Sequence, residues 1–312
     1  MSEPHDYDDA DIEASRAPLL DHLVELRSRL IICVLAMAIG FAICFAFSKQ
    51  IYIFLLHPFA IAAQLLAVEN ANHAQPAQGV DVLKFLSGTR DLFLALVGIK
   101  EVPAAPNADK LNLVFTAPLE FFFTKLKLAG FGAVVLTFPV LAWQVYGFVA
   151  PGLYKRERNA FVPFLLASPT LFLMGAALVY YVILPFVLWF SLSQQIVDAQ
   201  VSVQLLPKVS DYLSLVTTLL LAFGLCFQLP VVLTLLGMAG IVSSKALASG
   251  RRYAIVGVFV VAAVVTPPDP ISQTMLAVPI ILLYEISILC VKLIEKRRRL
   301  EDEEAGRDIV PI

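Results

Sequence analysis

The chain has 312 residues, of which 59% are hydrophobic and 15% are charged, and its mean hydropathy is +0.81. A water-soluble domain of this length could not bury so much apolar surface, so the composition excludes an ordinary soluble protein. The net charge of −2 says little, because the positions of charges in a membrane protein matter more than their sum.

Six apolar segments follow one another along the chain and predict an all-α membrane protein with six transmembrane helices. The first 17 residues form an acidic tail with no basic start before a short apolar run, so no cleaved signal peptide is expected. We expect a membrane domain over 18–295 with a long first outer loop at about 57–118, and a charged tail over 296–312. The segments run over about 30–47, 126–150, 160–190, 212–240, 253–266 and 271–291.

Lysine and arginine in the short connections predict the orientation of these helices. One side of the membrane would carry nearly all of them, whereas the other side has only Lys208 among its short loops. The positive-inside rule therefore places both termini in the cytoplasm, and the long outer loop does not count in this comparison. Within that loop, the interrupted apolar stretch 82–99 is expected to be a rim helix. The cytoplasmic cations are Arg27, Arg29, Lys155, Arg156, Arg158, Lys245, Arg251, Arg252, Lys292, Lys296, Arg297, Arg298 and Arg299.

Two features predict an irregular bundle. The fifth segment, Tyr253 to Thr266, has 14 residues and would span about 21 Å, against a hydrocarbon core of about 30 Å. Proline also occurs inside most segments, where each one frees a backbone carbonyl that must find another partner and bends the helix. We therefore expect a kinked, cupped bundle. These prolines are Pro139, Pro163, Pro169, Pro185, Pro230 and Pro279.

Two glutamates lie at the predicted cytoplasmic surface. Glu25 is four residues before Arg29, the spacing of an ordinary helical ion pair, and Glu157 stands among basic residues. Each is explained either as a solvated surface pair or as an acceptor for the guanidinium group of a partner, which binds carboxylates in a two-pronged manner. Spacing by itself favours the surface pair.

Polar residues at the ends of other segments have similarly open explanations. Asp211 is expected to cap the helix of the fourth segment, and Asp269 to stabilise a turn. Thr266, Gln273 and Thr274 belong to a polar cluster at the outer end of the last hairpin. These three side chains either satisfy freed backbone groups or hydrogen-bond a partner helix.

Gln228 and Glu285 lie inside the fourth and sixth segments, and a carboxylate within a membrane is a functional hypothesis by default. The chain has no phosphate-binding glycine loop, no metalloprotease motif and no nucleophile elbow, which disfavours an ATPase or a hydrolase. The four histidines show no ligand spacing, and the four cysteines lie singly in apolar runs. We therefore expect no enzyme activity, metal, cofactor or nucleic-acid partner.

Several short strings, taken in order, resemble the TatC family, the multispanning subunit of the twin-arginine protein translocase. The resemblance covers about 18–295, and it is the ordered set on six segments that makes it specific. The strings are His22 to Arg27, Pro58, Thr116-Ala117-Pro118 with Phe121 to Phe123, Ala150 to Tyr154 with Glu157, Phe227 to Pro230, and Thr266 to Asp269 with Ser272 to Thr274.

This resemblance implies a function and a set of site residues. TatC proteins bind the twin-arginine signal peptides of folded cargo in the bacterial cytoplasmic membrane, together with TatB-like and TatA-like single-span partners and membrane lipid. They form oligomers and use the proton-motive force. On the matching positions, signal-peptide contacts would be Glu25, Arg27, Tyr154 and Glu157, and partner-helix contacts would be Thr266, Gln273 and Thr274. The other motif positions are Pro58, Pro151, Asp211, Pro267, Pro268 and Asp269.

Two other functions are compatible with a polytopic bundle. A secondary transporter of a small solute usually has internal repeats and broken helices that meet around charged groups at mid-membrane, whereas the distinctive groups here cluster at the surfaces. A membrane scaffold without a transport role is the second alternative. The chain also departs from the family at Gln228, where many members carry glutamate, because glutamine does not titrate.

Overall fold

The computed structural model describes residues 6–72, 114–149, 161–193, 196–197, 202–203, 208–265 and 270–307. Nearly all of these residues are helical. The elements are α1 (Asp6–Ala46), α2 (Ser48–Asn72), α4 (Glu120–Val149), α5 (Phe161–Leu178), a π-helical turn η3 (Val179–Ile183), α6 (Leu184–Ser193), β1 (Ile196–Val197), β2 (Ser202–Val203), α7 (Val209–Cys226), α8 (Leu229–Met238), α9 (Ser244–Ser249), α10 (Arg251–Val265) and α11 (Pro270–Arg307).

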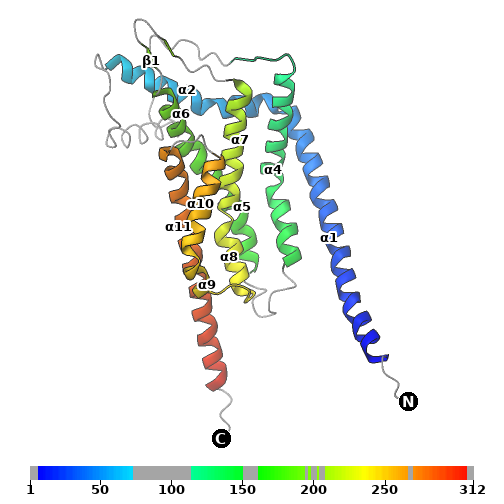
Figure 1. The fold of residues 1–312 in the computed structure, drawn as a ribbon. Coiled ribbons are helices and arrows are strands. Elements are labelled where there is room, and N and C mark those ends of the chain that lie inside the picture. The colour runs from blue at the N-terminus through cyan, green and yellow to red at the C-terminus, as the bar shows by residue number, and fades with distance from the viewer. Residues whose placement is uncertain are drawn as a thin grey trace.

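The long helices run side by side, and α2 lies across one end of them (Figure 1). The start of α1 and the end of α11 lie at the opposite end, which we call the terminal end; the other is the α2 end. The two strands form a small antiparallel hairpin that pairs Ile196 with Val203. The all-α membrane fold is thus confirmed, with this hairpin as a minor addition.

Five helical segments of the described residues are long and apolar enough to cross a membrane. The predicted fifth span is present as α10, which has 15 residues and extends about 22 Å, again shorter than a hydrocarbon core of about 30 Å. The count of six spans therefore stays a prediction. The five segments are Val24–Ala46, Glu120–Phe148, Leu166–Leu188, Val209–Met238 and Gln273–Arg297.

The structure shows how some of the predicted segments and loops are built. The stretch expected to begin the first outer loop at about 57 is helical in α2 as far as Asn72, and the stretch 82–99 lies outside the described residues. The charged tail is helical as far as Arg307, as part of α11. The fourth segment is not one helix, because the chain turns at Phe227 and Gln228 between α7 and α8.

Close packing of α1 on α4 depends on glycine. A Cβ atom added at Gly40 of α1 would lie 2.6 Å from Cγ2 of Thr137, and one added at Gly132 of α4 would lie 2.8 Å from Sγ of Cys44. Small residues let helix backbones approach in lipid, where packing rather than hydrophobicity drives association. Apart from this contact α1 is mostly exposed. Only 11% of the most apolar stretch within its candidate membrane span, Val24–Ala46, is buried.

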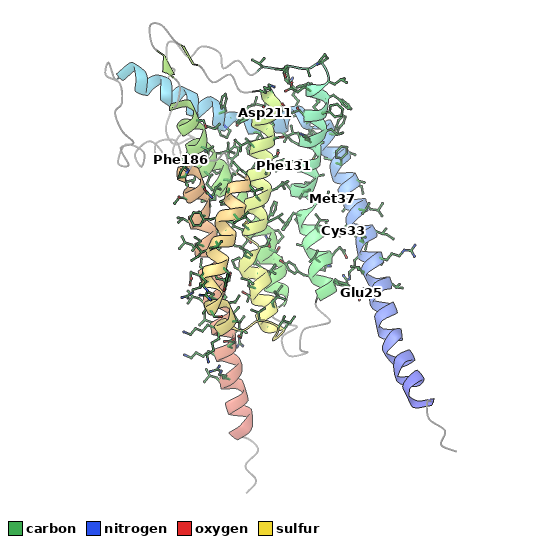
Figure 2. All side chains as sticks on the ribbon, in the orientation of Figure 1. Glu25, Cys33, Met37, Phe131, Phe186 and Asp211 are labelled. Carbon is green, nitrogen blue, oxygen red and sulfur yellow. The ribbon has the colours of Figure 1, made fainter. Side chains whose placement is uncertain are left out.

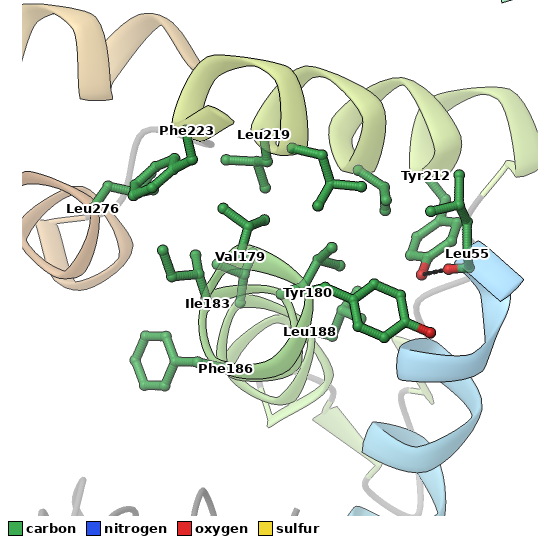
Figure 3. Packing of buried hydrophobic residues seen from close by; sticks show 14 of the residues in the cluster. Leu55, Val179, Tyr180, Ile183, Phe186, Leu188, Tyr212, Leu219, Phe223 and Leu276 are labelled. Carbon is green, nitrogen blue, oxygen red and sulfur yellow. Dashed lines mark hydrogen bonds between the residues drawn. The ribbon is translucent and has the colours of Figure 1, made fainter. Parts of the chain in front are cut away.

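The largest buried cluster joins α2, η3, α6, α7 and α11, and includes Tyr180 and Tyr212 (Figure 3). The hydroxyl of Tyr212 donates to the backbone carbonyl of Leu55 at 2.7 Å, and that of Tyr180 donates to the carbonyl of Phe54 at 2.9 Å. Phe54 lies four residues before Pro58, which has no N–H to donate to that carbonyl. Tyr180 therefore supplies the hydrogen-bond partner that Pro58 cannot.

A second proline is accommodated by a change of helical period. Pro185 cannot donate to the carbonyl of Tyr181, and the π-helical turn η3 ends two residues before it. The N–H of Leu184 donates instead to the carbonyl of Val179, five residues back. The third segment therefore continues through Pro185 with an altered backbone register.

Candidate functional site at the terminal end

Glu25 lies on α1 at the terminal end and already holds a guanidinium group (Figure 2). Nε and Nη2 of Arg29 donate to Oε1 of Glu25 at 2.9 and 2.6 Å. Nη1 of the same arginine donates to Oε1 of Gln144 on α4 at 3.4 Å. The Glu25 side chain is 36% exposed and that of Arg29 26%. The site is thus a half-exposed carboxylate shaped to accept arginine.

The Glu25–Arg29 ion pair within α1 could be predicted from the four-residue spacing in the sequence. The contact that α4 makes with Arg29 could not. Gln144 is 115 positions from Arg29, and no periodicity or motif in one sequence signals such a contact. Gly147 of α4 also belongs to this site, because a Cβ there would overlap Nη1 of Arg29. Arg27 is exposed on α1. It lies two residues after Glu25, and side chains at that spacing on a helix do not face each other.

Tyr154, Glu157 and Pro151 lie outside the described residues, so the structure does not test their predicted roles. The helix ends on either side of them are described. Helix α4 ends at Val149 and α5 begins at Phe161, both at the terminal end (Figure 1), where Glu25 also lies (Figure 2). The connection that carries Glu157 therefore starts and finishes on the same side of the bundle as Glu25.

The predicted partner-helix residues are only partly described. Thr266 lies outside the described residues, as do Pro267, Pro268 and Asp269. Nε2 of Gln273 donates to the carbonyl of Phe259 at 2.9 Å and so ties α11 to α10. The exposed Thr274 hydroxyl donates to the carbonyl of Pro270 at 2.7 Å. Both side chains thus bond backbone carbonyls of this chain.

Gln228 lies at the turn between α7 and α8 in a buried polar network. Its Nε2 donates to the carbonyl of Ser168 at 2.9 Å, while its Oε1 accepts from the Ser168 hydroxyl at 2.7 Å and from the Tyr146 hydroxyl at 3.4 Å. All three residues are buried. A neutral amide can donate and accept at once, so this network needs no charge on residue 228.

The prediction for Asp211 is wrong. Asp211 does not cap α7: the cap is Lys208, whose extended backbone starts the helix at Val209, so Asp211 falls in the exposed first turn. A carboxylate there still interacts favourably with the helix dipole.

Glu285 forms an ion pair with Arg251 at the start of α10, with Nη2 and Oε2 2.8 Å apart. The two side chains are 39% and 50% exposed. Glu285 is thus a half-exposed, partnered carboxylate inside the apolar segment Gln273–Arg297. Among the described residues, no group of three or more histidine, cysteine or acidic side chains could hold a metal ion.

Comparisons with known proteins agree along nearly the whole chain. A family model for the Sec-independent protein translocase protein (TatC) matches residues 21–279. Over 295 residues the chain is 40% identical to the Sec-independent protein translocase protein TatC of Magnetococcus marinus, which covers 95% of this chain and 90% of that protein. The protein of the same description in Escherichia coli K12 is 34% identical over 271 residues, 87% of this chain and 86% of the relative.

A solved structure shows the same fold. The crystal structure of a twin arginine translocase receptor, TatC, superposes with a TM-score of 0.64 at 32% sequence identity. The superposition covers 87% of this chain and 98% of the other.

Proposed function

Because the chain belongs to the TatC family, and is thus a multi-pass, non-enzymatic subunit of the Sec-independent protein translocase, we propose that it recognises the twin-arginine signal peptides of folded cargo. The observation that carries this proposal is the half-exposed Glu25 carboxylate at the terminal end, already bonded to an arginine. A carboxylate binds guanidinium through short, charge-assisted hydrogen bonds, which a neutral acceptor does not match.

Two arginines in the peptide require two acceptors. Glu157 is the second, because it belongs to the connection between α4 and α5, whose flanking helix ends lie on the same side as Glu25. Arg27 and Tyr154 complete the peptide-contacting set. Lysine in the peptide would bind less well, since an ammonium group is a compact point charge without the planar fork of guanidinium.

Partners and energy supply follow from the same family membership. The chain would work in an oligomer with TatB-like and TatA-like single-span proteins and with membrane lipid, through Thr266, Gln273 and Thr274. The sequence contains no phosphate-binding glycine loop, which supports the proton-motive force as the energy source rather than ATP. Pro58, Pro151, Pro267, Pro268 and Asp269 would shape the loops and helix ends. The comparisons give no support to a secondary transporter of a small solute.

Both termini are proposed to face the cytoplasm of a bacterial cell, because basic residues are concentrated in the connections on that side. In a variant without its four native cysteines, a cysteine at Val80 should react with an impermeant thiol reagent added to intact cells. A cysteine at Ala305 should react only after the membrane is opened. Labelling of both positions from the same side would contradict this topology.

The function is tested by export in a bacterium that lacks its own TatC-family protein. We expect the chain, expressed with its TatB-like and TatA-like partners, to export a folded reporter that carries a twin-arginine signal. Export should stop when the two arginines become lysines or when an uncoupler collapses the proton gradient. Export that persists with the lysine pair would contradict arginine recognition, and export that survives the uncoupler would contradict the energy source.

A further inference from the structure

Arg29 bonds the carboxylate of Glu25, which in the proposed function binds the signal peptide. Two of its nitrogens bond the same oxygen of Glu25, at 2.6 and 2.9 Å, from the next turn of the same helix. A second guanidinium cannot take those positions on Oε1 while Arg29 remains there. A two-pronged contact with both carboxylate oxygens of Glu25 therefore requires the peptide arginine to replace Arg29 at Oε1.

Arg29 also has a second acceptor within reach. Its Nη1 lies 3.4 Å from Oε1 of Gln144, which is longer than a typical hydrogen bond of about 2.9 Å and leaves room for it to tighten. Gly147, one turn further along α4, provides the space for the guanidinium group, since a Cβ at that position would overlap it. The face of α4 opposite Glu25 is thus shaped to hold Arg29 when it leaves the carboxylate.

We infer that Arg29 is an internal competitor at Glu25, which an incoming peptide arginine displaces toward Gln144. This inference rests on the proposed function. The exchange keeps Glu25 paired in both states, so the half-exposed carboxylate is never left alone in the headgroup zone. It also makes binding weaker and more readily reversed than two new arginine–carboxylate contacts would be, because one existing contact must break.

The test is the dissociation constant of a twin-arginine signal peptide for the full chain in nanodiscs. Removing the competitor with Arg29→Gln should raise affinity by about 3- to 10-fold, the effect of one partly exposed, charge-assisted contact. Gly147→Ala keeps all charges but fills the space on α4 into which Arg29 would move, so it should lower peptide affinity. In the background Glu25→Ala, Arg29→Gln should give no gain, because the contact for which the arginines compete is gone.

Two control variants separate competition by Arg29 from a general charge effect and from the effect of an added methyl group. Lys292→Gln removes one positive charge from an exposed position of α11 and measures the general electrostatic gain for a cationic peptide. Gly130→Ala adds the same methyl group to α4 at a position with no atom within 4 Å, and should change nothing.

Unchanged or weaker peptide binding in Arg29→Gln, with Glu25→Ala still weakening it, would overturn the inference and leave the proposed function intact. A gain no larger than that of Lys292→Gln would also overturn it, by showing only a charge effect. If Glu25→Ala itself leaves affinity unchanged, the failure lies with the proposed site.

Discussion

Replacing Glu25 or Glu157 by alanine is expected to weaken binding of a twin-arginine signal peptide by about 1–3 kcal/mol for each residue, the range for hydrogen bonds to charged groups. Each carboxylate would accept one guanidinium near the low-dielectric headgroup zone, where such contacts are stronger than in water. The loss at Glu25 should be the smaller of the two, because peptide binding there also breaks the existing bond from Arg29.

The measurement is a binding titration in nanodiscs with both single variants, the double variant and a lysine-pair peptide. Glu25→Gln is the matched variant, since it keeps the shape of the side chain and removes only its charge. Helix content and thermal stability should change little, because the Glu25 side chain is 36% exposed rather than part of the buried core. Unchanged affinity in a well-folded double variant would show that arginine recognition lies elsewhere.

Removing the Tyr180 hydroxyl is expected to destabilise the docking of α2 on the bundle. In Tyr180→Phe, the carbonyl of Phe54 loses the 2.9 Å bond that replaces the missing N–H of Pro58. An unsatisfied buried carbonyl costs about 1–3 kcal/mol; this bond is part-buried, and double-mutant measurements in membrane proteins also give small values, so the lower part of that range is expected. Unfolding in mixed micelles by a denaturing detergent, followed by circular dichroism, would measure the loss.

Pro58→Ala provides a specific rescue. Alanine at position 58 restores an N–H that can bond the Phe54 carbonyl within α2, so it should recover most of the stability lost in Tyr180→Phe. The same change should not rescue Tyr212→Phe, because the Tyr212 hydroxyl bonds the carbonyl of Leu55 instead. Equal rescue of both tyrosine variants, or of neither, would refute this account of Pro58.

Much of the architecture could be predicted from residue chemistry alone. A run of about 20 apolar residues has few stable states in lipid other than a helix, because its backbone must satisfy its own hydrogen bonds. The short α10 and the Glu25–Arg29 pair follow from counting residues along a helix, so both were predictable. The TatC-family resemblance, carried by ordered motifs at the segment ends, likewise needed no coordinates.

Contacts between distant segments were decided only by the tertiary structure. Lys208 rather than Asp211 is the N-cap of α7. A helix starts where the backbone leaves its extended conformation, and several polar residues nearby could serve as the cap. The sequence contains Pro58 and Tyr180 but nothing that pairs them across 126 positions. Likewise, only the packing of α1 on α4 brings Gln144 and Gly147 to Arg29. Such pairings depend on how whole helix faces fit together, which local periodicity does not encode.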